Sequence, residues 1–220
     1  MKNQELRAVV FDVDGMLLDT KEFIFQAYED TLKRFGHQVP HRTVMSKQIG
    51  RGLEECYLAF APNGDIKALS LAHRAFQDRP EIVKLIVTYP GVSDLLQQLQ
   101  KAGLRLAVFS SRKVTLAPSL QRAGLIEFFG AMVQGDDVTH HKPHPEGLLK
   151  ALDELGVPPH QAAMVGDAAV DILAGKAAGV SLTIGITHGF GTQTELEAAM
   201  PDYIVHSIDE IAPILLTVNK

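Results

Sequence analysis

The stretch Ala8-Val9-Val10-Phe11-Asp12-Val13-Asp14-Gly15 decides the fold. Its first four residues form a continuous apolar run, which is typical of a central parallel strand that is buried on both faces. Two carboxylates and a glycine follow directly where this run ends. Because open α/β sheets bind ligands beyond the carboxyl ends of their strands, the stretch predicts a strand and a functional site beside it.

Further apolar runs follow the same pattern along the chain. They occupy residues 104–109, 131–133, 162–165, 181–186 and 203–205. Helical patterns lie between them: a proline opens the segment 145–155, and a glycine follows each of the segments 94–102, 145–155 and 171–178. Strands that alternate with helices predict an α/β fold with a doubly wound parallel sheet.

One interval interrupts this alternation. Gly15 and Ser110 are 95 positions apart, whereas a βαβ unit needs only ~30 residues. Apolar residues recur at helical spacing in 23–35, and the segments 53–60 and 66–87 continue the helical pattern. We therefore expect a small α-helical cap at residues 20–88, inserted into a core of residues 1–19 and 89–220, with hinges near 18–20 and 88–91.

The composition bears on compartment and partners. The chain has 220 residues, 46% of them hydrophobic, which is enough for a sizeable core. A net charge of −5 provides no basic footprint for nucleic acid, and no apolar stretch approaches the ~20 residues of a membrane helix. The single cysteine, Cys56, suits a reducing compartment. We expect a cytoplasmic protein whose partner is neither nucleic acid nor a membrane; a monomer is plausible.

Two acidic pairs indicate a metal-dependent chemistry. Asp12 and Asp14 are two positions apart on an extended chain, so both carboxylates can face one cavity. Asp167 follows the run 162–165, and Asp171 shares a face with it if a helix begins there. A hard cation such as Mg²⁺ prefers carboxylates, a carbonyl and waters. Asp12, the backbone carbonyl of Asp14 and Asp167 could supply these ligands.

A hydroxyl and an ammonium complete the set. Ser110 follows the second strand, where its hydroxyl and the free amides of the turn, Ser111 included, can donate to phosphate oxygens. Prolines close to Lys142 stiffen its loop and fix where the lysine projects. We do not expect the neighbouring histidines to form a metal cluster, because adjacent histidines on a loop point apart and no acid lies nearby. These are His140, His141 and His144.

Each motif also has a purely structural interpretation. Asp-x-Asp-Gly can form a turn, a Gly-Asp pair can cap a helix, and serines and lysines are common on loops. The ordered set favours phosphoryl transfer through an aspartate, because this chemistry needs all of its parts. Enzymes accelerate phosphate-monoester hydrolysis by up to ~10²¹-fold, and proton transfer supplies only ~10²–10⁴ of this. Positioned charges must supply the remainder.

The same residues resemble the haloacid dehalogenase-like superfamily over essentially the whole chain. Asp12-Val13-Asp14-Gly15 is similar to its first motif, Ser110 to its second, Lys142 to its third, and Gly166-Asp167 with Asp171 to its fourth. The position and size of the expected cap resemble the phosphoglycolate phosphatase and β-phosphoglucomutase subgroup. The aspartate at position 14 resembles the phosphate-ester enzymes of the family, and not its dehalogenases or phosphonate-cleaving members.

The resemblance implies a role for each residue. Asp12 would form an aspartyl-phosphate, and Asp14 would act first as an acid and then as a base. Ser110 and Lys142 would hold the phosphoryl group and the nucleophile. Asp167 would bind Mg²⁺, with Asp171 supporting it directly or through water. One position departs from the family: Met16 stands where threonine is usual, and methionine cannot supply the hydroxyl's hydrogen bond.

Three functions remain open at this stage. The first is a magnesium-dependent phosphatase acting on a small phosphorylated metabolite such as phosphoglycolate. The second is a sugar-phosphate mutase that returns the phosphoryl group to a sugar hydroxyl, and the third is an inactive binding or scaffold protein. The intact motif residues favour an enzyme but do not choose between water and a sugar as acceptor. In the cap, the glycine-flanked Arg51 is the expected contact for a carboxylate or second phosphate of the leaving group.

Overall fold

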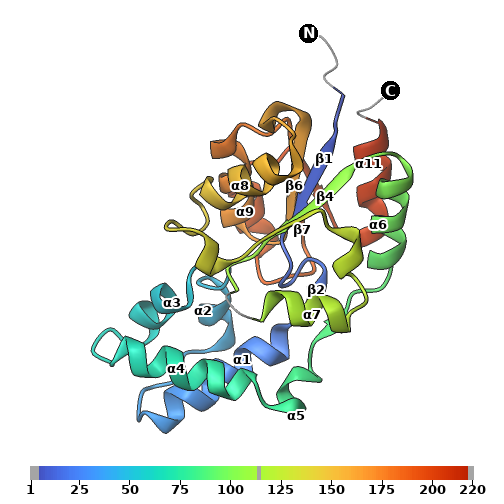
Figure 1. Ribbon diagram of the computed structural model, residues 1–220. Helices are drawn as coiled ribbons and strands as arrows, with labels where there is room; N and C mark the ends of the chain where they lie inside the picture. Colours follow the sequence, from blue (N-terminus) through green and yellow to red (C-terminus); the bar gives the residue numbers. More distant parts are fainter. Residues whose placement is uncertain (1–4, 113–114, 218–220) are drawn as a thin grey trace.

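The core of the molecule is a six-stranded parallel sheet, seen in the upper part of Figure 1. The computed structural model describes residues 5–112 and 115–217. The strand order is β5-β4-β1-β6-β7-β8, and all neighbouring strands are parallel. The strands are β1 (Ala8–Phe11), β4 (Arg105–Phe109), β5 (Ala131–Val133), β6 (Ala162–Gly166), β7 (Leu182–Ile186) and β8 (Tyr203–Val205). Each run predicted as a strand is one, and the predicted doubly wound α/β class is confirmed.

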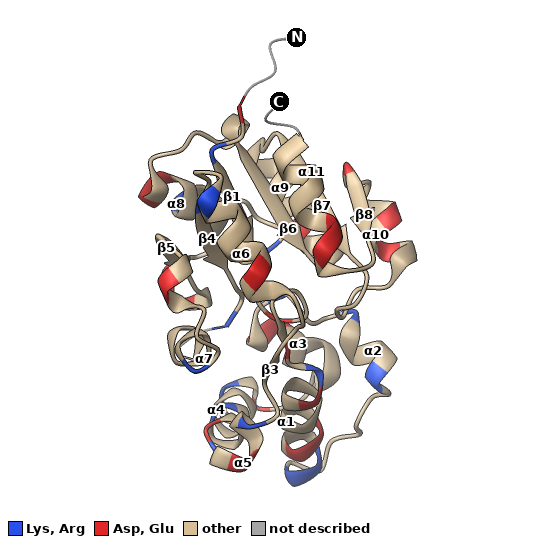
Figure 2. Ribbon diagram, turned by 90° about the vertical axis from the view of Figure 1, so that its right-hand side faces the viewer, with Lys and Arg blue, Asp and Glu red and all other residues tan. Residues whose placement is uncertain are grey.

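Helices cover both faces of this sheet. Alternate residues of β1 point to opposite faces: Val9 and Phe11 pack with the cluster that contains α6 (Val92–Lys101) and α11 (Ile211–Thr217). Ala8 and Val10 pack against α8 (Glu146–Leu155) on the other face. The remaining helices of the core are α7 (Leu116–Arg122), α9 (Ala169–Ala178), α10 (Gln193–Ala199), and the 3₁₀ turns Ile126–Phe128, Gly135–Asp137, Pro159–Gln161 and Ile208–Glu210. In Figure 2 the strands are mostly tan, with charged residues concentrated on helices and loops.

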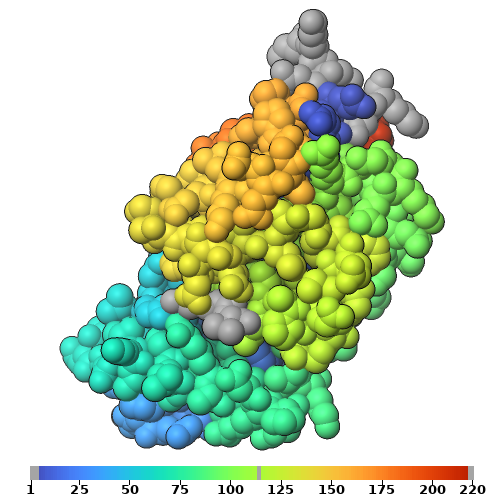
Figure 3. Space-filling view, in the orientation of Figure 1, coloured from blue at the N-terminus to red at the C-terminus, as the bar shows by residue number. Residues whose placement is uncertain are grey.

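A helical unit, which we call the cap, lies at one end of the core. It comprises α1 (Lys21–Arg34), α2 (Arg42–Ser46), α3 (Leu53–Phe60), α4 (Ile66–Gln77) and α5 (Pro80–Val83). The cap has its own apolar cluster, in which α1 packs against α4 and α3 against α4. In the space-filling view its blue-to-green surface lies directly against the core (Figure 3).

The sequence analysis did not predict the strand pairing at the connections to the cap or the break in its last helical segment. Two short antiparallel strands, β2 (Leu18–Asp19) and β3 (Val87–Thr88), pair where the chain enters and leaves the cap. The helical pattern expected over 66–87 is divided, because α4 ends at Gln77 and Pro80 starts the new helix α5. The paired strands hold the two chain crossings between core and cap side by side.

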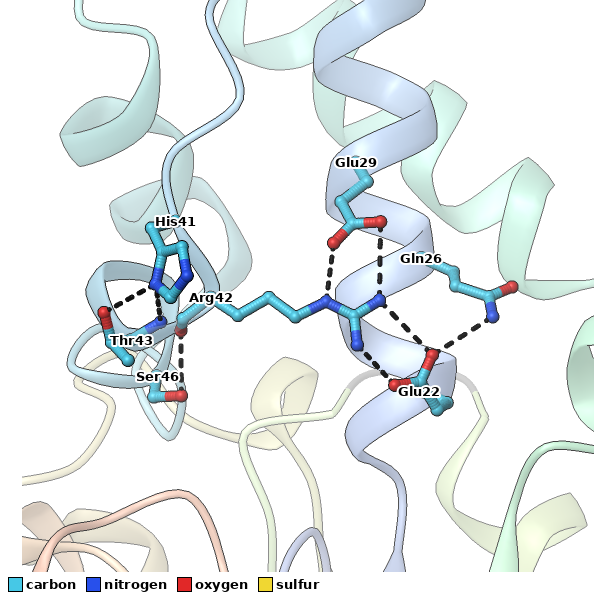
Figure 4. Close-up of polar contacts among 7 residues, drawn as sticks. All are labelled: Glu22, Gln26, Glu29, His41, Arg42, Thr43 and Ser46. Carbon is cyan, nitrogen blue, oxygen red and sulfur yellow. Dashed lines mark hydrogen bonds and ion pairs between the residues drawn. The ribbon is translucent and has the colours of Figure 1, made fainter.

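An arginine fastens α2 to α1 within the cap (Figure 4). Arg42 donates from Nε to Glu29 Oε1 at 2.7 Å and from Nη1 to Glu22, whose other oxygen accepts from Gln26. The hydrogen bond from Arg42 lowers the pKa of Glu22. Such exposed pairs each contribute about 0–1 kcal/mol, so the network orients α2 more than it stabilises the fold. The segment that follows α2 reaches the core.

Among the described helices, none combines the length and the apolar character that a bilayer crossing requires.

A buried histidine lies in the middle of the cap. His73 Nδ1 is 2.9 Å from the Tyr57 hydroxyl oxygen, and its ring packs edge-on against Tyr28 at a centroid distance of 4.6 Å. Burial, with a smaller effect of the neighbouring Arg74 cation, lowers the pKa of His73 to about 3. The imidazole is therefore neutral in the folded protein at any pH near neutrality.

We expect His73 to make the protein less stable in acid. Its folded-state pKa lies below the ordinary 6.5, so the unfolded chain binds the proton first as the pH falls. Stability is unaffected above that ordinary value and is lost progressively toward the folded-state pKa. Between pH 7 and pH 5 the loss amounts to about 2 kcal/mol. Urea unfolding at both pH values measures it, and the His73→Gln variant should lack this part of the loss.

The matched control is His160→Gln, which removes an exposed histidine. That variant should keep the full acid-induced loss. An identical pH dependence in wild type and in His73→Gln would show that His73 does not cause it.

Candidate active site

The carboxyl ends of three adjacent strands meet at one place. Because β1 lies between β4 and β6 in the sheet, the residues after these strands become neighbours. Asp12 follows β1, Ser110 follows β4 and Asp167 follows β6. The chain winds outward in both directions from β1, so this is the point at which ligands bind in open α/β sheets. The structure thus brings together residues that are far apart in the sequence.

A buried lysine connects two of the carboxylates. Lys142 Nζ lies 2.5 Å from Asp12 Oδ1 and 2.8 Å from Asp171 Oδ1, and its side chain has no exposed surface. It also lies 4.8 Å above the centre of the Phe109 ring. Burial alone would lower the pKa of Lys142, but Asp12 and Asp171 outweigh burial and raise it. Lys142 is therefore a fixed cation beside Asp12.

The carboxylates outnumber the buried cation. Asp12, Asp167 and Asp171 are all buried, with oxygens that lie within 4.8 Å of one another. The pKa of Asp12 is raised to about 7, chiefly by burial. The Lys142 cation lowers this pKa, whereas repulsion from Asp171 and Asp14 raises it further. Burial and Asp12 raise the pKa of Asp167 as well.

A divalent cation fits this arrangement of charges. Three buried carboxylates face a single buried ammonium, which contacts Asp12 Oδ1 and Asp171 Oδ1, so the cluster keeps an excess of negative charge. Carboxylate oxygens are the ligands that hard cations such as Mg²⁺ prefer. A bound cation would offset the excess negative charge of the cluster and lower the pKa values that burial has raised.

Glycines shape the wall behind Asp167. Phe190 donates its backbone N–H to Asp167 Oδ2 at 2.6 Å. A Cβ on Gly189 would lie 2.0 Å from that same oxygen, and one on Gly191 would lie 2.3 Å from the Asp167 carbonyl oxygen. The sequence analysis missed this segment, whose signal is a Gly-Phe-Gly tripeptide shortly after a strand. It also joins the two units, because the Phe190 ring packs against Phe25 of the cap.

The loop after β1 closes without the usual threonine. Gly15 N–H donates to the Leu18 carbonyl at 2.8 Å, and Leu17 N–H donates to the Val13 carbonyl at 3.0 Å. The Met16 side chain is fully buried in the main apolar cluster of the core. Hydrogen bonds between main-chain groups therefore hold this turn. Met16 contributes apolar packing instead of the hydrogen bond that a threonine hydroxyl would make.

Asp14 is paired with an arginine that sequence reasoning did not single out. Arg112 donates from Nε to Asp14 Oδ2 at 2.6 Å and from Nη2 to Asp14 Oδ1 at 2.5 Å. The only sequence signal was an arginine two positions after Ser110, at the end of a strand. Ser110 is buried, and its Oγ accepts the backbone N–H of Arg112 at 3.1 Å.

A cavity of about 110 Å³ lies between the core and the cap. Its core wall includes Asp12 and Ser110, and its cap wall includes Arg51. Arg51 is the residue that the sequence analysis expected to contact the leaving group from the cap. The Ser111 hydroxyl donates to the Gly50 carbonyl oxygen, so this serine contacts the cap in the present arrangement.

The loop that carries Lys142 differs from the expectation for its histidines. His140 Nδ1 lies 2.8 Å from Glu146 Oε2, and the rings of His140 and His144 are 4.5 Å apart. The expectation that no acid lies nearby was wrong, because the loop folds back onto the first turn of α8. Both Glu146 oxygens accept backbone N–H groups, from Thr139 at 2.7 Å and from His140 at 3.0 Å. These bonds lower the pKa of Glu146 to about 2. The same hydrogen bonds hold the loop that carries Lys142 against the first turn of α8.

Comparison with known proteins assigns the family. The family model described as haloacid dehalogenase-like hydrolase matches residues 9–184. The chain belongs to this family. The haloacid dehalogenase-like match begins in β1 and ends in β7, and so includes the whole cap and every motif residue. The family predicted from the sequence motifs is confirmed, and with it the expectation of a hydrolase.

Individual relatives are similar over almost the whole chain. Pyrophosphatase PpaX from Bacillus cereus is 31% identical over 217 residues, which are 98% of this chain and 99% of that protein. A predicted phosphatase from Clostridium acetobutylicum has a TM-score of 0.84 at 27% identity, covering 97% of this chain and 99% of its own. CbbY from Rhodobacter sphaeroides, solved in complex with phosphate, has a TM-score of 0.79 at 27% identity, covering 94% and 96%.

Proposed function

We propose that this hydrolase is a magnesium-dependent phosphatase that acts on a small phosphate monoester through an aspartyl-phosphate on Asp12. The observation that carries the proposal is the placement of Asp12. Its carboxylate contacts the buried Lys142 cation, adjoins Asp167 and Asp171, and lines a cavity together with Ser110. Relatives that are named as phosphatases, and one that was solved with phosphate, support the same chemistry.

Asp12 is the nucleophile in this proposal. Lys142 holds one of its oxygens, and the carboxylate attacks phosphorus while the bond from phosphorus to the leaving oxygen breaks. Asp14 gives a proton to that leaving oxygen. Asp14 then removes a proton from water, which attacks the aspartyl-phosphate, releases inorganic phosphate and restores Asp12. Ser110, Ser111 and Lys142 hold the phosphoryl oxygens.

The acidic cluster is the proposed metal site. Asp12, the Asp14 carbonyl and Asp167 would hold Mg²⁺, with Asp171 as a direct or water-mediated support. When bound, the cation would supply positive charge to the transferring phosphoryl group. The contact from Phe190 N–H to Asp167 Oδ2 orients that carboxylate before any ion binds.

The cap, which we propose spans residues 20–88, controls access to the site. Closure of the cap over the core would exclude bulk water during transfer. Arg51 lines the cavity from the cap side, opposite Asp12, and is the proposed contact of the cap with the leaving group.

A panel of phosphate compounds tests the proposed function. It includes 2-phosphoglycolate, sugar phosphates, pyrophosphate and an aryl phosphate, each with Mg²⁺ and ranked by kcat/KM. We expect phosphate release that stops in excess chelator. Isomerisation of a sugar phosphate without net phosphate release would establish the mutase instead, and turnover of no compound would overturn the proposal.

Magnesium dependence gives a sharper prediction at Asp167. Asp167→Asn keeps the size of the side chain but weakens a carboxylate ligand, so the half-saturating Mg²⁺ concentration should rise about 10–100-fold. Phosphate release measured against Mg²⁺ concentration shows the shift. The matched control, Asp153→Asn on the exposed face of α8, should leave the curve unchanged. An unchanged curve in Asp167→Asn would show that the acidic cluster does not hold the catalytic cation.

A further inference from the structure

The pair formed by Asp14 and Arg112 carries a further inference about substrate class. We infer that Arg112 recognises a second anionic group on the leaving group of the substrate, and that this anion releases Asp14 from Arg112. The inference rests on the proposed function, because it assigns Asp14 as the proton donor. It predicts phosphate esters or anhydrides whose leaving group carries a carboxylate or another phosphate.

The first observation is that Arg112 occupies both oxygens of Asp14. The bonds measure 2.6 Å and 2.5 Å, and the side chains are only 8% and 13% exposed for Arg112 and Asp14. In this pair Asp14 accepts a charge-assisted hydrogen bond on each oxygen and holds no proton that it could give. Asp14 must therefore leave this pair before it can give a proton to a leaving oxygen.

The second observation is that Arg112 has contacts besides its pair with Asp14. Its Nη1 donates to Ser119 Oγ of α7 at 2.8 Å, and its guanidinium lies 5.0 Å from the centre of the Phe23 ring in α1. One contact comes from the core and the other from the cap. If Asp14 departs, Arg112 remains as a positioned cation between the two units.

The third observation is the wall of the cavity. Arg112, Arg51 and Arg74 all line it, and Arg74 has a partner in Glu54 at 2.9 Å. The phosphoryl group must sit by Asp12, so the leaving group extends toward the cap. Arg51 and Arg74 lie on the cap side of the cavity, and Arg112 lies between the two units. The planar fork of Arg112 binds carboxylate and phosphate in the same bidentate manner in which it now binds Asp14.

These observations describe an exchange of anions. A carboxylate or phosphate on the leaving group takes the place of Asp14 at Arg112. The released Asp14 carboxylate takes up a proton from solvent and then gives it to the leaving oxygen of that same substrate. A neutral leaving group makes no such exchange, so it leaves Asp14 paired. Discrimination should therefore be seen in kcat as well as in KM, because the anion both binds the substrate and frees the acid.

Matched substrates test the exchange directly. 2-Phosphoglycolate and 2-hydroxyethyl phosphate have similar size and both are alkyl esters, but only the first has an anionic leaving group; pyrophosphate is the phosphate counterpart. We expect wild type to favour phosphoglycolate or pyrophosphate over hydroxyethyl phosphate by about 100-fold or more in kcat/KM. Arg112→Gln should lower kcat/KM for the favoured anion about 100-fold. It should also raise kcat on hydroxyethyl phosphate severalfold, because Asp14 is no longer held.

Two further variants separate recognition from structure. Arg112→Lys keeps the positive charge but lacks the planar pair of guanidinium donors. It should therefore retain only part of the preference for substrates with an anionic leaving group. Arg122→Gln removes the other arginine that donates to Ser119 Oγ, at 3.4 Å, and should leave the preference intact. An equal loss on anionic and neutral substrates in Arg112→Gln would overturn the inference, as would a wild-type enzyme without preference.

Binding distinguishes failure of this inference from failure of the proposed function. Calorimetry on Asp12→Asn protein measures the affinity for 2-phosphoglycolate and for 2-hydroxyethyl phosphate without turnover. The anionic compound should bind more tightly, and adding Arg112→Gln should remove that difference. Wild type that turns over no phosphate compound would refute the proposed function, whereas equal binding of both compounds would refute the role of Arg112.

Discussion

Asparagine in place of Asp12 abolishes turnover, with an expected fall in kcat of about 10⁴-fold or more. The amide has nearly the size of the carboxylate but cannot attack phosphorus, so no covalent intermediate forms. The fold should persist, because Lys142 keeps its contact with Asp171 at 2.8 Å. Phosphate release on the best substrate of the panel, together with chemical trapping of phosphorylated protein, measures the effect.

Asp14→Asn is the informative control for this result. It removes the proposed acid but keeps the nucleophile, so it should still form phosphorylated protein from an aryl phosphate, whose leaving group needs little protonation. Dephosphorylation by water should be slow, and the intermediate should accumulate. Phosphorylation trapped at a residue other than Asp12, or Asp12→Asn activity near wild type, would contradict the assignment.

The parts of the fold that the sequence predicts are those that local pattern and sheet topology determine. The run Ala8–Phe11 is apolar at every position because both of its faces are covered, and the neighbouring strand β6 is apolar throughout for the same reason. Once these strands are parallel, the residues after β1, β4 and β6 must meet at one edge. Asp12, Ser110 and Asp167 were predicted together for this reason, although they are separated by about a hundred and fifty positions.

Side-chain contacts that depend on how loops fold and which strands become neighbours could not be predicted in this way. Arg112 pairs with Asp14 across 98 positions, and nothing in its neighbouring sequence marks it. Glu146 meets His140 because a loop folds back, whereas the sequence analysis treated loop histidines as isolated. The tripeptide at Gly189 lies behind Asp167 because β7 is adjacent to β6. Each of these features depends on which strands and loops become neighbours, which periodicity does not encode.

Methionine in place of Lys142 should produce the largest combined effect on activity and stability. The substitution keeps an unbranched side chain, shorter by the ammonium nitrogen, and removes the buried cation from Asp12 and Asp171, whose oxygens lie 2.5 Å and 2.8 Å from Nζ. Leaving buried carboxylates without their partner costs about 3–5 kcal/mol in the free energy of unfolding. Activity should fall about 10³-fold or more, because the charge that faces the phosphoryl group is lost.

Magnesium should partly rescue the stability of Lys142→Met, because the metal then supplies the positive charge that the ammonium no longer provides. A ligand at 100 times its dissociation constant adds about 2.7 kcal/mol to the free energy of unfolding, and tighter binding by the more anionic cluster makes the gain larger in the variant than in wild type. Urea unfolding in chelator and in Mg²⁺ measures both. Lys150→Met, an exposed lysine on α8, should change neither value. Two outcomes would contradict this prediction: a Lys142→Met variant as stable as wild type in chelator, or one that gains no stability from Mg²⁺. Either would show that Lys142 and the metal do not both compensate the negative charge of the three buried carboxylates.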